Sequence, residues 1–60
     1  MEKIKEQTDG THIYMKLQLD DGGIEEIDVY FPDGKMRYIT TGDGDEARRK
    51  QIISAFQTLY

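Results

Sequence analysis

The sequence contains no cysteine, a single proline and no apolar run long enough to span a membrane. The absence of cysteine excludes a disulfide framework and a thiolate metal site. The first residues also lack the apolar core of a signal peptide, so we expect a cytoplasmic protein with no membrane partner. Histidine and serine each occur once, which leaves few side chains for nucleophilic or acid–base chemistry.

The chain has 60 residues, which is room for one small domain. A domain this short buries only roughly 60% of its unfolded surface, so a thin core of marginal stability is expected. Its apolar residues nevertheless follow a regular pattern, which indicates a folded domain rather than a disordered chain. Pairing with a second copy would add buried surface.

Two segments alternate apolar and polar residues with a period of two, which is typical of half-buried strands. The apolar positions are Ile13, Met15, Leu17 and Leu19 in residues 11–19, and Ile27, Val29 and Phe31 in residues 24–31. Glycine-containing turn sequences follow both segments, at 20–23 and 32–35. If Ile27 faces Leu17 and Val29 faces Met15, the first connection needs an odd number of residues.

A third strand is predicted over residues 35–41, and its buried side is open between two alternatives. The inward residues are either Met36, Tyr38 and Thr40, or Arg37, Ile39 and Thr41. A helix is predicted over about 44–59, with an apolar stripe of Ile52, Phe56 and Leu59. Asp43 followed by Glu46 has the spacing of a capping box at the start of this helix.

These elements predict an α+β domain over residues 11–60, preceded by a flexible lead-in over residues 1–10. The domain is a three-stranded antiparallel β-meander (about 11–19, 24–31 and 35–41) with one C-terminal helix (about 44–59) packed on one face. Tight turns join the strands, so they should lie in sequence order. One helix covers one face, which leaves the other face of the sheet open.

The open face is the first candidate functional surface, because tyrosine is enriched where proteins recognise one another. Its residues are His12, Tyr14, Lys16, Tyr30 and, under the second alternative for the third strand, Tyr38. The structural alternative is that these aromatic side chains only stabilise the sheet through cross-strand pairs. The outer strand edges could also accept a partner strand, although Lys35 and Arg37 would guard one of them.

An acidic pole is the second candidate, because a meander brings its first turn to the same end of the sheet as the entry to the helix. The acidic residues expected there are Asp20, Asp21, Glu25, Glu26, Asp43, Asp45 and Glu46. Such a pole could dock on a basic protein surface or imitate nucleic-acid phosphate, or it could serve only solubility and helix capping. Calcium-loop spacing is absent, so neither a metal ion nor a cofactor is expected.

Catalysis and nucleic-acid binding both have weak support. His12 beside Asp28 is the only plausible acid–base pair, and Ser54 lies inside the predicted helix, so we expect no enzyme. The order of elements is similar to that of some DNA-binding modules, which carry rows of basic residues on the open sheet face. Here the net charge is −4, and the local support is limited to Arg48, Arg49 and Lys50.

The sequence therefore favours a small non-enzymatic interaction domain that binds a protein partner, or a copy of itself, through the open face or the acidic pole. A nucleic-acid-binding module is the first alternative. The second is a designed scaffold without a natural function, because the turn and capping signals agree with one another unusually well.

Overall fold

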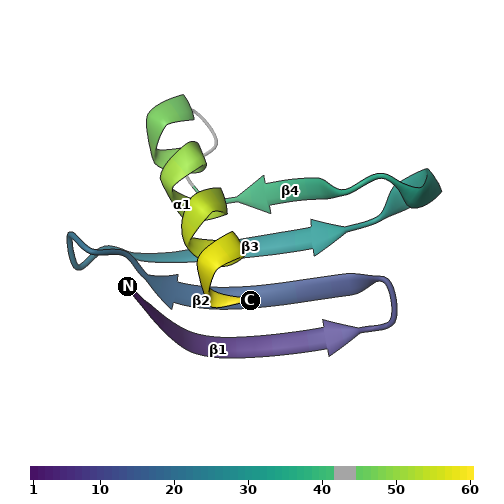
Figure 1. Cartoon of the computed structure of the whole chain (residues 1–60), viewed down its shortest axis with the longest axis horizontal. Coiled ribbons are helices and arrows are strands. Elements are labelled where there is room, and N and C mark those ends of the chain that lie inside the picture. Colours follow the sequence, from purple (N-terminus) through teal and green to yellow (C-terminus); the bar gives the residue numbers. More distant parts are fainter. Residues whose placement is uncertain (42–44) are drawn as a thin grey trace.

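The computed structural model describes residues 1–41 and 45–60, and it confirms the α+β class. An antiparallel sheet carries one helix, α1 (Glu46–Leu59), which lies across β2, β3 and β4 on one side (Figure 1). The strands follow one another in sequence order, as predicted for a meander. They are β1 (Glu2–Asp9), β2 (His12–Gln18), β3 (Ile24–Tyr30) and β4 (Arg37–Thr40).

The sheet has four strands, which corrects the predicted count of three, because β1 occupies the segment expected to be a flexible lead-in. Every residue of β1 is exposed, so the strand carries no apolar alternation from which it could be recognised. Its pairing with β2 follows a two-residue connection, in which Gly10 has a φ of +54°. Glycine with positive φ at that position favours a tight hairpin.

The register between β2 and β3 differs from the one considered above. Met15 lies opposite Ile27 and Ile13 lies opposite Val29, a shift of two residues along β2. The reason is the loop, which is closed by a hydrogen bond from the Leu19 backbone N–H to the Gly23 carbonyl at 2.9 Å. Residues 19–23 thus form a connection with the odd residue count that the alternation requires.

β4 resolves the open question of parity. Thr40 is buried and Tyr38 is half-buried on the helix side, whereas Arg37 and Ile39 are exposed on the opposite side. The Tyr38 ring lies edge-on to the ring of Phe56, with centroids 6.2 Å apart. A short 3-10 turn, Pro32–Gly34, connects β3 to this strand.

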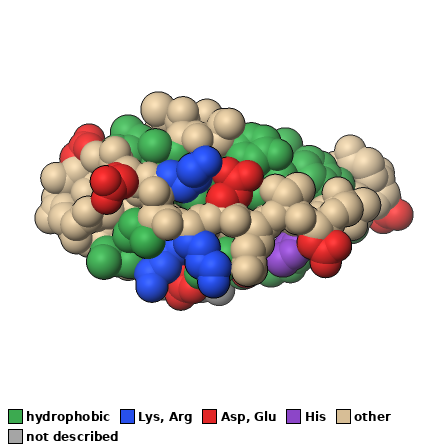
Figure 2. All heavy atoms as spheres, turned by 90° about the horizontal axis from the view of Figure 1, so that it is seen from below, with side chains coloured by type: hydrophobic (Ala, Val, Ile, Leu, Met, Phe, Trp, Pro, Cys, Tyr) green, Lys and Arg blue, Asp and Glu red, His purple; other side chains and the backbone are tan. Residues whose placement is uncertain are grey.

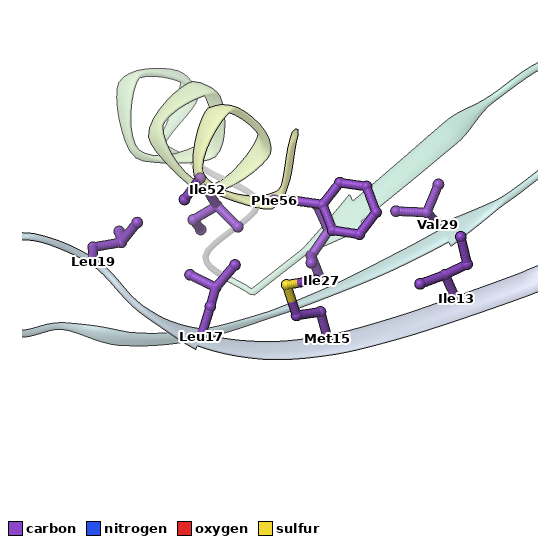
Figure 3. Close-up of a cluster of buried hydrophobic side chains, with 9 residues drawn as sticks. Ile13, Met15, Leu17, Leu19, Ile27, Val29, Ile52 and Phe56 are labelled. Carbon is purple, nitrogen blue, oxygen red and sulfur yellow. The ribbon is translucent and has the colours of Figure 1, made fainter. Parts of the chain in front are cut away.

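The core lies between the sheet and α1, and it confirms the predicted apolar faces of the first two predicted strands and the helix (Figure 3). Helix side chains point down onto side chains of β2 and β3. The buried hydrophobic residues are Ile13, Met15, Leu17, Leu19, Ile27, Val29, Ile52, Ala55 and Phe56. Nothing in the helical part of the described chain is long and apolar enough to cross a membrane.

The helix begins one residue after Asp45, whose carboxylate accepts a hydrogen bond from the Arg48 backbone N–H at 3.1 Å. Asp45 is therefore the N-cap, in place of the predicted Asp43, which lies outside the described residues. Asp45 supplies the same acceptor chemistry two positions later, and Glu46 becomes the first helical residue.

Candidate functional site

The open face is the side of the sheet opposite α1, and no other described element covers it. Strand register arranges its side chains in rows that run across the strands, because residues opposite one another in a ladder point to the same side. The first row is Asp9, His12, Tyr30 and Arg37; the second is Gln7, Tyr14, Asp28 and Ile39; the third includes Lys5, Lys16 and Glu26.

Polar contacts between neighbouring rows hold this surface in one arrangement. His12 Nε2 lies 2.9 Å from Asp28 Oδ1, and the His12 ring is 5.8 Å from that of Tyr30. The Tyr14 hydroxyl donates a hydrogen bond to the Glu26 carboxylate. That bond raises the pKa of Tyr14, because only the protonated phenol can donate it. The aromatic side chains are thus positioned before any partner arrives.

Apolar side chains also remain uncovered on the open face. Ile24 is 55% exposed and Ile39 is 46% exposed. A shallow hollow of about 160 Å³ lies beside Tyr14, and Glu26, Asp28 and Ile39 contribute to its lining. The surface therefore combines exposed apolar area with oriented polar groups, as recognition surfaces do.

The structure places four of the five predicted open-face residues together and excludes the fifth. His12, Tyr14, Lys16 and Tyr30 lie on the open face, whereas Tyr38 lies on the helix side because β4 takes the other parity. The contribution of β1 to the open face was missed, since that strand has no apolar alternation. Ile39 could have been assigned to the open face only if the parity of β4 had been known.

Several residues of the predicted acidic pole are already paired within the molecule. Arg48 Nε donates to Glu25 Oε2 at 2.7 Å, and Arg48 Nη1 donates to Asp21 Oδ2 at 2.6 Å. The N-terminal ammonium group lies 2.7 Å from Asp20 Oδ1. Glu26 projects on the other face of the sheet from Glu25, toward Tyr14. The acidic side chains therefore do not present one continuous negative surface.

Arg48 ties the start of α1 to the loop between β2 and β3. Its hydrogen bond lowers the pKa of Asp21, while the hydroxyl of Thr41 and then Arg48 lower the pKa of Glu25. Gly23 makes room for the guanidinium, because a Cβ at that position would collide with Arg48 Nη2. From the sequence, Arg48 was expected in a small basic patch beside the acidic pole; its specific pairing depends on a contact between segments far apart in the chain.

The other two basic residues near the start of α1 differ from each other in their surroundings. Arg49 Nη2 donates to the backbone carbonyl of Tyr38 at 3.2 Å, whereas Lys50 is exposed. Arg48 and Arg49 thus have partners inside the molecule, which reduces the basic surface that this patch offers for phosphate contacts.

His12 and Asp28 form the acid–base pair considered from the sequence, with Nε2 and Oδ1 2.9 Å apart. Ser54 lies within α1, and its carbonyl accepts a hydrogen bond from the Thr58 hydroxyl. Across residues 1–41 and 45–60, no group of three or more histidine or acidic side chains could hold a metal ion. The open face is the strongest candidate site.

The outer edges of the sheet, along β1 and β4, are further surfaces that could receive a partner strand. Seen from the β1 edge in Figure 2, basic side chains gather near the middle with acidic side chains beside them, and acidic side chains also lie toward both ends. Lys3 Nζ lies 2.9 Å from Glu6 Oε1, and the register of β1 shifts between Lys3 and Lys5. Charged side chains and a register irregularity both discourage the addition of another strand.

Comparisons with protein families, with curated proteins and with solved structures found no match to this chain.

Proposed function

We propose that this chain is a non-enzymatic protein-interaction domain that binds a protein partner through its open face. The observation that carries this proposal is the contrast between the two sides of one sheet. The helix side is filled by α1, whereas the open side presents Tyr14 and Tyr30 in fixed orientations beside exposed isoleucine. Tyrosine brings large contact area at a small cost in side-chain entropy.

The acidic pole supports this function less well than the open face. Asp20, Asp21 and Glu25 each have a cationic partner within the chain, and Asp45 caps the helix. A partner that bound these carboxylates through arginine side chains would have to replace internal ion pairs. Binding to the open face does not require internal ion pairs to be replaced. Its side chains bond to neighbours within the face and leave the surface that points away from the sheet available.

Site-specific photocrosslinking tests the proposal. Benzoylphenylalanine is placed at Tyr30 on the open face and, in a matched control, at Tyr60, which is 61% exposed at the end of α1. Both proteins are irradiated in cells that express the chain. We expect a discrete protein adduct from position 30 and none of the same mass from position 60.

Two results would contradict the proposal. One is the absence of any adduct at position 30 and at a second open-face site, Tyr14, in a folded and expressed chain. The other is an identical set of adducts from positions 30 and 60, which would indicate random collisions rather than a binding surface.

A further inference from the structure

We propose that the open face binds the same face of a second copy of this chain, around a two-fold axis that runs parallel to the strands between β2 and β3. This inference rests on the proposed function and names its partner. A two-fold axis in this position lays β1 of one copy over β4 of the other, and β2 over β3. The two-fold axis reverses the order of the strands in each row. The observation behind the proposal is that each row of the open face is complementary in charge and side-chain type to the same row read in the opposite order.

The first row shows the complementarity most clearly. It begins with Asp9 on β1 and ends with Arg37 on β4, with His12 and Tyr30 between them. Reversal across the axis sets Asp9 of each copy over Arg37 of the other, and His12 over Tyr30. Two charge pairs and two aromatic contacts therefore form from a single row.

The other rows obey the same rule. Lys16 of one copy lies over Glu26 of the other, because these residues are opposite each other in the β2–β3 ladder. Tyr14 likewise lies over Asp28, which His12 of its own copy holds in place. No row places two side chains of the same charge over each other.

The alternative two-fold axis, which runs across the strands at the central row, lacks this property. It places each residue of that row over its own counterpart, so that Asp28 meets Asp28. Opposed carboxylates at the centre of an interface disfavour association. The charge layout therefore selects the axis parallel to the strands.

The size of the face indicates a weak and reversible dimer. Four strands at about 4.8 Å spacing and seven residues at about 3.4 Å give roughly 450 Å² of flat area per copy. Such an interface lies at the lower end of those that form specific complexes, and dissociation constants in the micromolar range are expected. Stacked sheets cross at roughly 30°, a rotation that the long Arg37 and Lys16 side chains can span.

Charge reversal at Asp9 and Arg37 tests the geometry. These residues occupy the outer strands β1 and β4, so they do not pair within one copy. Asp9→Lys sets Lys against Arg37 at both ends of the dimer, and Arg37→Asp sets Asp against Asp9. Each variant alone should dimerise about tenfold more weakly than the original chain, as measured by sedimentation over a range of concentrations.

The decisive measurement is the equimolar mixture of the two variants. In the mixed dimer the Lys at position 9 meets the Asp at position 37, and the original Arg37 meets the original Asp9. Affinity should therefore return to within about twofold of the original chain. Lys50→Glu, which reverses an exposed charge on α1, is the control and should leave dimerisation unchanged. Circular dichroism confirms that each variant is folded.

Three results would overturn the inference. The first is a monomer at concentrations up to about 1 mM, well above the expected dissociation constant. The second is weakening by the single variants without recovery in their mixture. The third is equal weakening by Lys50→Glu. A monomeric chain that still forms crosslinks from position 30 to another protein would remove this inference and leave the proposed function intact.

Discussion

Met15 and Leu17 on β2 have no solvent exposure, whereas Tyr14 and Lys16, their neighbours on the same strand, are only half-buried. The backbone is shared, so the difference arises from what lies above each side. α1 fills the space above Met15 and Leu17 with Ile52 and Phe56 (Figure 3). Above the open face there is no second layer among the described residues, and its side chains bond to one another instead.

The two sides of this sheet therefore have different roles: the helix side provides stability, and the open face is available for recognition. Removing apolar contacts on the helix side leaves a cavity that a thin core cannot fill by rearrangement. Changes on the open face alter only lateral contacts, so that surface can serve binding without being required for folding. The following substitutions test how complete the separation is.

The largest effect is expected from Leu17→Ala. Leu17 is fully buried, and its truncation should lower the free energy of unfolding by about 2–5 kcal/mol. A domain of this length has a total stability of similar size, so much of the variant should be unfolded at room temperature. Lys16→Ala, one residue away on the open face, is the matched control and should remain folded in the same urea titration. Equal destabilisation by both variants would refute the separation of the two faces.

Arg48→Met should give the next largest effect, because it leaves Glu25 without its cationic partner while keeping the apolar stem. The Glu25 side chain is only 18% exposed, so water restores its solvation poorly. The midpoint of thermal unfolding should fall by several degrees. Lys50→Met removes an exposed charge from the same helix and should change the midpoint little.

The Arg48 bridge also predicts a dependence of stability on pH. Asp21 and Glu25 have pKa values below their usual ones, so the folded state holds their protons less tightly than the unfolded state does. Their contribution is present above the unfolded pKa values, near 4, and is lost as the pH falls through the lower folded values. Urea titrations between pH 7 and 2.5 should show this loss in the original chain and a smaller one in Arg48→Met. If stability fell with pH equally steeply in both proteins, other carboxylates would dominate the pH dependence.

A stabilising change is expected at Thr40. Its hydroxyl is buried and has no hydrogen-bond partner in the described chain. Thr40→Val keeps the shape and removes the unsatisfied polar group, which should raise the free energy of unfolding by about 1 kcal/mol. Thr41→Val is the contrasting control, since the Thr41 hydroxyl donates to Glu25 at 2.7 Å and its loss should destabilise. A neutral or harmful Thr40→Val would indicate that the hydroxyl has a bonding partner.

The smallest effect on folding is expected from Tyr30→Ala. It removes one cross-strand aromatic contact, which corresponds to about 0.2–1 kcal/mol. Association of two copies should weaken far more than folding does, because Tyr30 lies over His12 in the proposed dimer. Unfolding and sedimentation measured on the same sample compare the two losses directly. Similar losses in both would make Tyr30 a structural residue rather than an interface residue.

Local pattern in the sequence determined which residues of β2, β3 and α1 face the core. Period-two alternation and the helical stripe depend only on near neighbours, so Met15, Val29 and Phe56 could be assigned before any contact was known. The turn chemistry likewise indicated where the chain reverses and that the strands lie in sequence order. Four members of the open face followed from the same alternation.

Three features were decided by the tertiary structure: the presence of β1 as an additional strand, the parity of β4 and the pairing of Arg48. β1 is held by backbone hydrogen bonds to β2, which leave no trace in side-chain hydrophobicity. The inward position of Thr40 depends on the ladder with β3, and the ion pairs of Arg48 join residues more than twenty positions apart. The parity and the ion pairs are set by the packing of whole elements, whereas the hairpin between β1 and β2 had a local signal in the Asp9-Gly10 turn.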